Sequence, residues 1–242
     1  MQRRRTLQPL PLPPCPPAPV STGTAPAGSA GAIPKVIADE LADIRSYERG
    51  TTVLPQGSDG GRIFVVRDGL VREAAVSPDG RWFVHALLGP GEVFGTLAPS
   101  MQTPAAVRTV RRTTLSVLSA EGLGELLAKR PEVARWLIAA IERRAVRAQR
   151  TVHDLAWCDV AARLRRRLLA LAREHGHPIA CGIRLEIPIT QEDLGAMIGA
   201  TRETVNRSLV ALIASGGIRV DRRRYVILDA FARSLAADDI AP

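Results

Sequence analysis

The apolar residues of this chain change their spacing several times, and each change predicts a different kind of element. Between residues 47 and 118, short apolar runs are separated by Asp68-Gly69, Asp79-Gly80 and Gly89-Pro90-Gly91. Short β-rich runs bounded by such dipeptides are typical of antiparallel strands. Their regular spacing predicts a small antiparallel barrel or jelly roll.

The segment before these strands has a different composition. Residues 1–33 begin with three arginines and continue with Pro, Gly, Ala and Ser, which cannot bury a core, so we expect a disordered tail. Prolines interrupt every apolar stretch, which argues against a secretory signal. A short amphipathic helix is then expected up to about residue 45, because four apolar residues follow at spacings of 4, 4 and 3: Ile33, Ile37, Leu41 and Ile44.

After Pro131 the pattern predicts one long helix with a heptad seam. Apolar and small side chains recur at alternating steps of 4 and 3, at Leu137, Ile141, Arg144, Ala148, Thr151, Leu155 and Cys158. Such a seam predicts pairing with the same helix of a second copy. Packing on the chain's own barrel is the alternative, and one helix can do both.

Asp159 has the short acceptor side chain that a helix N-cap prefers, so we expect a joint between two helices and a hinge between two domains there. The helix that follows has one apolar face, with Val160, Leu164, Leu168 and Leu171. Its arginines lie elsewhere, at Arg163, Arg166, Arg167 and Arg173. Gly176 and Pro178 are expected to end it.

Two short helices are predicted after residue 190, the first ending at Gly199 and the second with Val205, Leu209 and Leu212 on its apolar face. Thr190 occupies an N-cap position, and Asp193 completes a variant capping box. Gly195 permits close approach to a second helix, for which Thr201 is the expected N-cap. Two helices joined by about three residues form a helix-turn-helix, a motif that binds DNA.

The polar face of the second helix carries four side chains that match base edges in the major groove: Arg202, Glu203, Asn206 and Arg207. The alternative is a solvated face with pairing between Glu203 and Arg207. A β-hairpin with three arginines follows, which makes a winged helix. We expect six residues to contact phosphate or position the reading helix: Thr190, Thr201, Thr204, Arg222, Arg223 and Arg224. Solubility is the alternative role of the three arginines.

Charge supports a polyanionic partner. The chain has 33 Lys and Arg against 24 Asp and Glu, a formal charge of +9, and six of these nine net charges lie in residues 143–242. A GC-rich genome would also produce arginine bias. The three cysteines are scattered and no apolar run is long enough to cross a bilayer, so we expect a cytoplasmic protein without a disulfide framework, a bound metal or membrane contact.

These observations predict a dimeric regulator of transcription that binds double-stranded DNA. A ligand-sensing module with secondary DNA binding is the alternative. An enzyme is not expected, because the sequence shows no nucleophile–base pairing and no phosphate-cradling glycine loop, and its four histidines are dispersed.

The segment TQEDLGAMIGATRETVNRSLVAL resembles the helix-turn-helix of the CRP/FNR family, the cyclic-AMP receptor protein and fumarate–nitrate regulator superfamily. RETVNR is similar to the family's Arg-Glu-x-x-x-Arg reading motif, and the likeness covers roughly residues 35–230. It implies an α+β fold with an N-terminal cyclic-nucleotide-binding-like β-roll, a long dimerisation helix and a C-terminal winged helix-turn-helix. It also implies a homodimer that reads a pseudo-palindrome of TGTGA-like half-sites and contacts RNA polymerase.

On this basis the chain divides into four parts: a disordered Pro-rich tail over 1–33, an effector-type β-roll domain over 34–130, a dimerisation helix and hinge over 131–158, and a winged helix-turn-helix DNA-binding domain over 159–242.

The effector pocket that the resemblance implies departs from the family pattern at three places. Where cyclic-nucleotide binders have Phe-Gly-Glu and then Arg-Ser or Arg-Thr, this chain has Phe94-Gly95-Thr96 and Thr103-Pro104, and Ala148-Gln149 replaces the Thr-Ser pair that meets adenine. These changes remove the ribose acceptor and the counter-charge for a buried phosphate. We therefore expect no cofactor and no standard cyclic-AMP binding; a cyclic-AMP-activated regulator or another ligand sensor is the alternative.

Other effector chemistries also lack their residues. An iron–sulfur cluster needs several N-terminal cysteines, and Cys15 stands alone. A haem ligand, His85 or His153, would lack a second shell. Cys158 is either a buried structural thiol or an exposed thiol switch. Three arginines either serve a different anion or are solvated at a strand edge: Arg108, Arg111 and Arg112.

Overall fold

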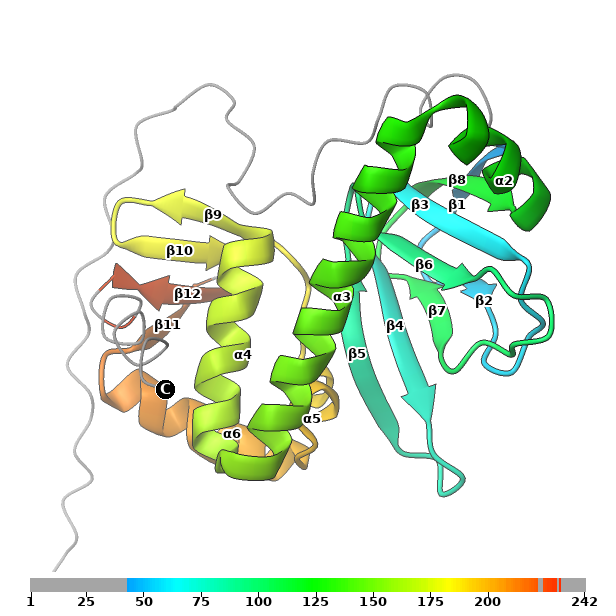
Figure 1. Ribbon diagram of the computed structural model, residues 1–242. Coiled ribbons are helices and arrows are strands. Elements are labelled where there is room, and N and C mark those ends of the chain that lie inside the picture. The colour runs from blue at the N-terminus through cyan, green and yellow to red at the C-terminus, as the bar shows by residue number, and fades with distance from the viewer. Residues whose placement is uncertain (1–42, 222–223, 230, 232–242) are drawn as a thin grey trace, which may run out of the picture.

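The computed structural model describes residues 43–221, 224–229 and 231, and contains two domains joined by one long helix (Figure 1). The expected tail over 1–33 and most of the helix from Ile33 lie outside the described residues. The expectation that this helix continues to about residue 45 is wrong. Residues Asp43–Tyr47 form strand β1, which pairs antiparallel with β8. Pairing with a neighbouring strand satisfies backbone groups that a helix end would leave free.

The N-terminal domain is a roll of two antiparallel sheets with strand orders β1-β8-β3-β6 and β2-β7-β4-β5. The strands after β1 are β2, Thr52–Leu54; β3, Arg62–Asp68; β4, Val71–Val76; β5, Trp82–Leu88; β6, Val93–Thr96; β7, Ala106–Thr109; and β8, Thr113–Ser119. Side chains from both sheets form the core, where the rings of Phe64 and Phe94 stack with centroids 4.9 Å apart. The roll expected over residues 47–118 is therefore confirmed.

The tight turn between β3 and β4 shows why the sequence places a glycine there. Gly69 has φ +99°, and a Cβ atom at this position would lie 2.4 Å from Thr113 Oγ1. A side chain would therefore meet both backbone strain and a steric clash. Asp68-Gly69 thus marks a true strand-to-strand turn.

Two helices follow the roll. Helix α2, Ala120–Lys129, begins at Ser119, whose side chain accepts a hydrogen bond from the Gly122 N–H. Helix α3, Pro131–Trp157, has proline in its first turn, where the missing N–H costs nothing. Both helices pack on the roll through a separate cluster that includes Leu126, Val133 and Leu137.

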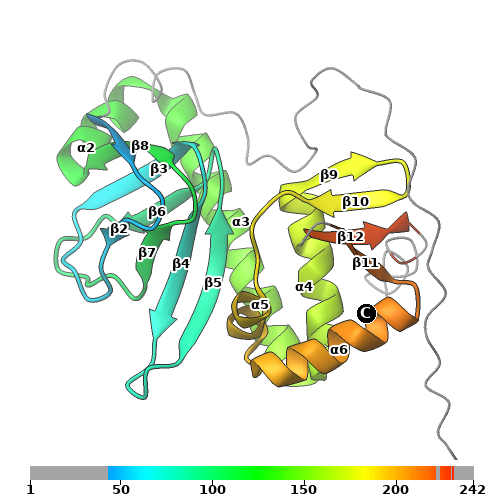
Figure 2. The ribbon, with the colours of Figure 1, turned by 180° about the vertical axis from the view of Figure 1, so that it is seen from behind.

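The described part of the C-terminal domain contains three helices, α4, α5 and α6, and a four-stranded sheet (Figure 2). Its elements are α4, Val160–His175; β9, Gly176–Ile179; β10, Gly182–Leu185; α5, Gln191–Ile198; α6, Arg202–Ala214; β11, Ile218–Asp221; and β12, Arg224–Leu228. The strand order β11-β12-β10-β9 shows that the expected wing hairpin extends a second hairpin, which sequence analysis did not predict.

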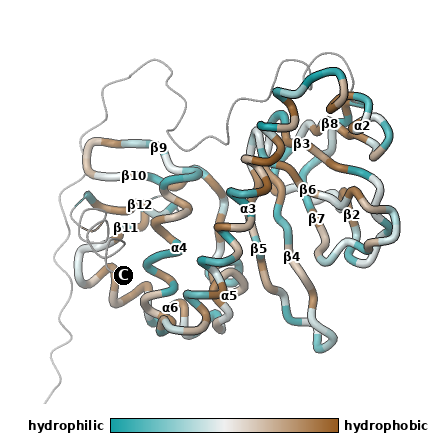
Figure 3. Tube along the Cα trace, in the orientation of Figure 1, coloured by the Kyte–Doolittle hydropathy of each residue, from teal (hydrophilic) through white to brown (hydrophobic). Residues whose placement is uncertain are grey.

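The two domains share one hydrophobic cluster. Leu70, Ala74, Val84 and Leu87 of the roll pack with buried residues of α4, α5 and α6. Hydrophobic and hydrophilic segments alternate along α3 and α4 in Figure 3, as expected for helices with one buried face. Within the described residues, no helix is both long and apolar enough to span a membrane.

Candidate DNA-binding surface and effector-type domain

The helix-turn-helix is built by three local signals in the sequence. Thr190 Oγ1 accepts a hydrogen bond from the Asp193 N–H at 3.0 Å, and Asp193 Oδ2 accepts one from the Thr190 N–H at 3.0 Å, so the capping box forms. Gly199 ends α5 in the left-handed conformation, with φ +64°. Thr201 then caps α6 by accepting from the Thr204 N–H at 3.3 Å.

Gly195 fixes how closely α5 approaches the turn that precedes α6. A Cβ atom there would lie 2.6 Å from the Ala200 carbonyl oxygen, and the Gly195 carbonyl oxygen accepts a hydrogen bond from the Ala200 N–H at 3.0 Å. Gly195 is buried, and the two helices pack through Leu194 and Met197 on α5 and Val205 and Leu209 on α6. The geometry of the motif therefore depends on a residue without a side chain.

The four expected base-reading residues all lie exposed in the first two turns of α6: Arg202, Glu203, Asn206 and Arg207. Arg207 Nη2 donates to Thr204 Oγ1 at 3.4 Å, and Asn206 Oδ1 accepts from Gln191 Nε2 at 3.1 Å. Gln191 was missed in the sequence. It is the first residue of α5, and its contact holds the Asn206 side chain across the two helices.

The wing carries only part of its expected cationic surface within the described residues, because Arg222 and Arg223 lie outside them. Arg224 begins β12 and forms an ion pair with the Glu186 carboxylate. Its Nη1 also donates to the Glu186 carbonyl oxygen at 3.1 Å. The guanidinium of Arg224 is thus held against its own domain, and its contact with phosphate stays a prediction.

The positions expected to form a degenerate effector pocket lie partly in the roll and partly on α3. Gly95 has φ +100°, and a Cβ atom there would lie 2.5 Å from the Arg62 carbonyl oxygen, while Thr96 is the partner of Arg62 in the β3–β6 ladder. Thr103 is buried, and its Oγ1 donates to the Pro55 carbonyl oxygen at 2.8 Å. Pro104, Ala148 and Gln149 are exposed, the last two on α3.

The three arginines considered for a different anion also have partners. Arg108 Nε donates to the Gly50 carbonyl at 2.6 Å, and Arg111 Nη2 donates to the Gly69 carbonyl at 3.1 Å. Arg112 lies 3.6 Å from the Glu48 carboxylate, and both side chains are largely exposed. These contacts support surface roles for the three.

Helix α3 has two distinct faces, which corrects the expected heptad seam. Leu137 is only 8% exposed because it packs in the chain's own core, and Thr151 is partly buried with its hydroxyl bonded to the Arg147 carbonyl. The exposed apolar residues follow steps of 3, 4, 3, 4 and 3: Ile138, Ile141, Ala145, Ala148, Val152 and Leu155. The sequence pattern mixed these two faces because they lie side by side on the helix.

An arginine of α3 also reaches into the roll, which the sequence did not indicate. Arg144 Nη2 donates to Glu73 Oε1 at 2.5 Å, and Nη1 donates to the Val93 carbonyl at 3.2 Å. The Glu73 side chain is 8% exposed. A buried carboxylate needs such a partner, so this pair ties α3 to β4 and β6.

The joint between α3 and α4 lies where it was expected, and its role as a hinge stays a prediction. Asp159 caps α4, and its Oδ1 accepts from the Ala162 N–H at 2.7 Å. Cys158 is partly buried, with Sγ 3.8 Å from Asp154 Oδ1. His153, Asp154 and Cys158 bring three metal-ligating atoms within 4.8 Å of one another, but Asp154 also pairs with Arg166 at 2.7 Å. The expected absence of a bound metal stays a prediction.

Two sets of ion pairs join the domains across the hinge. Arg72 on β4 lies 2.7 Å from the Asp193 carboxylate, which also closes the capping box of α5. Arg147 on α3 contacts Glu92 at 2.7 Å and Glu174 on α4 at 3.4 Å. Burial lowers the Arg147 pKa, but these two carboxylates outweigh it and leave the pKa raised. The C-terminal domain is therefore attached to the roll by side chains far apart in sequence.

Comparison with known proteins identifies both domains. Residues 44–130 match the cyclic nucleotide-binding domain model, and residues 162–232 match the Crp-like helix-turn-helix domain model. Among relatives, a CRP-like cAMP-activated global transcriptional regulator of Mycobacterium tuberculosis is 31% identical over 186 residues, which cover 76% of this chain and 83% of that protein. The cyclic AMP receptor protein of Thermus thermophilus is 32% identical over 199 residues, covering 79% and 89%.

Solved structures agree with these relatives. A transcriptional regulator of the CRP/FNR family from Thermus thermophilus superposes with a TM-score of 0.68 at 25% identity, over 81% of this chain and 97% of that one. The c-di-GMP-responsive global regulator CLP of Xanthomonas campestris gives 0.68 at 26% identity, over 80% and 96%. The expected α+β fold with a β-roll and a helix-turn-helix is confirmed.

Proposed function

The chain belongs to the CRP/FNR family of transcriptional regulators and is not an enzyme, and from this premise we propose that it acts as a homodimer on a pseudo-palindromic DNA site. We propose further that its roll works without standard cyclic-AMP ligation. The observation that carries the DNA proposal is the exposed polar surface at the start of α6.

Direct readout is supported by the chemistry of that surface. Arginine donates two hydrogen bonds to guanine, asparagine pairs with adenine, and glutamate accepts from cytosine. Arg202, Glu203, Asn206 and Arg207 are exposed, and no residue of the described core covers them. The N-terminal end of α6 adds a positive helix dipole, which favours approach to DNA. Thr190, Thr201 and Thr204 lie beside it, where their hydroxyls suit phosphate contacts.

Homodimerisation is supported by the exposed stripe of α3. Ile138, Ile141, Val152 and Leu155 are between 39% and 66% exposed in the single chain, although each is strongly apolar. Together with Ala145 and Ala148 they follow alternating steps of 3 and 4, which match the spacing at which two helices pack side by side. A symmetric pair of reading helices would then meet two half-sites one helical turn apart. Contact of such a dimer with RNA polymerase is part of the same proposal.

The effector proposal rests on Thr96, Thr103 and Pro104. None of these side chains supplies a carboxylate for a ribose or a cation for a cyclic phosphate, and the Thr103 hydroxyl is already bonded to backbone carbonyls. A phosphate buried without a counter-charge is costly. A cyclic-nucleotide-responsive regulator is the second candidate, since relatives are named as cAMP-activated or as a cyclic AMP receptor protein.

Fluorescence anisotropy tests the proposal directly. The full chain is titrated onto a labelled duplex with inverted TGTGA-type half-sites, and onto a scrambled duplex, at one salt concentration with and without cyclic AMP. We expect site-selective binding that is indifferent to cyclic AMP. Binding only with cyclic AMP would establish the second candidate, and equal affinity for both duplexes would refute this half-site.

A pair of variants identifies the reading residues. Arg207→Ala should weaken binding to the preferred site by about 1–3 kcal/mol and relax discrimination at one base position. Arg81→Ala is the control, because Arg81 lies at the β4–β5 hairpin and pairs there with Asp79. If Arg207→Ala left the ranking of base variants unchanged, α6 would not be the reading helix as assigned.

A further inference from the structure

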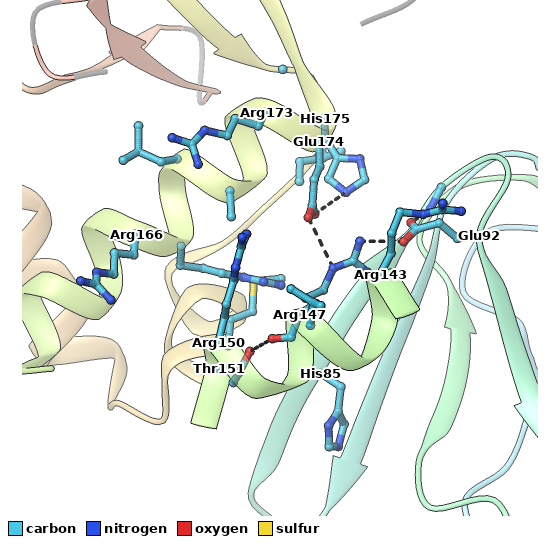
Figure 4. Close-up of a pocket in the computed structure, with 18 of the residues that line it drawn as sticks. His85, Glu92, Arg143, Arg147, Arg150, Thr151, Arg166, Arg173, Glu174 and His175 are labelled. Atoms are coloured by element: carbon cyan, nitrogen blue, oxygen red, sulfur yellow. Dashed lines mark hydrogen bonds and ion pairs between the residues drawn. The ribbon is translucent and has the colours of Figure 1, made fainter. Parts of the chain in front are cut away.

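A large cleft separates α3 from α4, and eight arginines are among the residues that line it. Its volume is about 1300 Å³, which exceeds the ordinary range of small-ligand pockets, roughly 300–1,000 Å³. Figure 4 shows Arg147 and Arg150 reaching from α3 towards α4, and Arg166 and Arg173 coming from α4. On α3 the cleft is lined by Arg143, Arg147 and Arg150, and near the C-terminal end of that helix also by Leu155 of the exposed apolar stripe.

The two helices turn arginine-rich faces towards each other. Half of the eight α4 positions that line the cleft are arginines, at Arg163, Arg166, Arg167 and Arg173; the others are Leu169, Ala170, Glu174 and His175. Like charges that face each other in a partly enclosed space repel, so this arrangement needs counter-charge.

The carboxylates of the cleft supply only part of that charge. Glu92 and Glu174 both bind Arg147, Asp154 binds Arg166, and Glu186 binds Arg184 and Arg224. Glu142 is exposed on α3. Across the described part of the chain, four arginines that line the cleft have no carboxylate oxygen within 4.0 Å: Arg143, Arg150, Arg163 and Arg167.

Two of these guanidinium groups are poorly satisfied. Arg167 is partly buried, and its Nε donates to the Met197 sulfur at 3.3 Å, a weak acceptor. Burial lowers the Arg167 pKa, Arg147 lowers it further, and Glu174 opposes the shift. Arg163 Nε is buried and has no hydrogen-bond partner among the described residues. A buried cationic donor without an oxygen acceptor is costly, and a ligand oxygen would remove that cost.

We propose that the cleft between α3 and α4 binds a small polyphosphate anion, held by Arg150 from one helix and by Arg163 and Arg167 from the other. Guanidinium forks match phosphate oxygens in bidentate geometry, and several of them require a ligand with more than one phosphate. Phe, Tyr and Trp are absent from the residues that line the cleft, so the phosphate chain rather than a stacked base carries recognition.

The position of the site gives binding a mechanical consequence. The anion bridges α3, which belongs with the roll, to α4, which carries the helix-turn-helix. It thereby offsets the repulsion between the two arginine faces and holds the reading domain in the docked arrangement. This site is separate from the roll's own effector positions at Thr96 and Thr103.

Isothermal titration calorimetry of the full chain with inorganic triphosphate tests the site, in a buffer free of phosphate at fixed ionic strength. We expect saturable binding of one triphosphate per chain, similar binding of ATP, and at least tenfold weaker binding of AMP and sulfate. If sulfate or AMP bound as tightly as triphosphate, the proposal would be overturned. Sulfate binding of that strength would reflect only unspecific charge screening, and AMP binding would reflect contacts with the base. Undetectable triphosphate binding would overturn it as well.

Variants locate the site. Arg150 is exposed, so Arg150→Met should keep the fold yet weaken triphosphate binding at least tenfold. Arg167→Met, whose folding is checked by circular dichroism, should do the same. Arg81→Met is the matched control, since the Arg81 side chain is 83% exposed at a distant hairpin. Unchanged affinity in Arg150→Met, or equal weakening in Arg81→Met, would refute this assignment.

Discussion

Replacing Ile141 by alanine tests whether the exposed stripe of α3 holds two chains together. Ile141 is 53% exposed in the single chain, and Ala145 and Ala148 follow it on the same stripe. In a symmetric dimer the change occurs twice, once on each helix. Truncation should therefore weaken association without disturbing the core, where Leu137 and Ala140 lie.

The magnitude follows from the exposed fraction. Full burial of an isoleucine side chain contributes about 1.5–3 kcal/mol, so covering the exposed half contributes about 1 kcal/mol per chain. The alanine side chain keeps a small part of this burial energy, and the rest is lost twice because the dimer has two Ile141 side chains. We expect the dimer to be weakened by about 1–3 kcal/mol, which is roughly a 5- to 150-fold rise in its dissociation constant.

Sedimentation equilibrium over a range of protein concentrations measures this constant directly. Val146→Ala is the matched control, because Val146 lies on the same helix with 45% exposure but lines the cleft. It should leave the dimer unchanged. If Val146→Ala weakened association as much as Ile141→Ala, or if neither had an effect, the stripe would not be the dimer interface.

Three further predictions address the helix-turn-helix, the domain junction and the buried histidine. Gly195→Ala should cost about 1–3 kcal/mol in thermal unfolding, because its Cβ would lie 2.6 Å from the Ala200 oxygen. Gly124→Ala, in open space on α2, should instead be neutral or stabilising, and equal losses would contradict this reasoning. Arg72→Ala removes the 2.7 Å ion pair with Asp193 and should therefore speed amide hydrogen exchange at the start of α5. The loss in the free energy of unfolding should stay below about 1 kcal/mol, because both groups are partly exposed. Unchanged exchange would show that the shared apolar core alone holds the domains together. Burial lowers the His175 pKa to about 4, with Glu92 opposing and Arg147 and Arg167 reinforcing the shift. The unfolded histidine therefore takes up its proton first, and stability should fall from about pH 6.5 to pH 4 by up to about 3 kcal/mol. In urea unfolding, His175→Gln should flatten that part of the profile, and an identical slope in both proteins would rule the histidine out as its source.

Much of the fold could be predicted because its signals are local. Asp68-Gly69 marks a strand turn, Asp159 caps α4, and Thr190 with Asp193 caps α5 within four residues of chain. The polar face of α6 follows from helical spacing alone. Such features depend on a residue's own backbone preferences and near neighbours, which the sequence displays directly.

Helix α3 shows where local pattern was insufficient. Leu137 and Ile138 are adjacent apolar residues, and spacing alone does not say which one the roll covers. The structure buries Leu137 and leaves Ile138 57% exposed. The same limit applies to β1, where Ile44 fitted a helical spacing but its backbone pairs with Ser116 of β8.

The sequence by itself determined the two domains, the long helix between them and the polar face of α6, because periodicity and caps are short-range properties. Only the tertiary structure decided which partners the charged side chains have. Arg72 meets Asp193 across 121 positions, Arg144 meets Glu73 across 71, and the arginines of α4 face those of α3 across a cleft. Folding brings such groups together through the packing of whole domains, and electrostatic partners depend on distance in space and on burial rather than on separation along the chain.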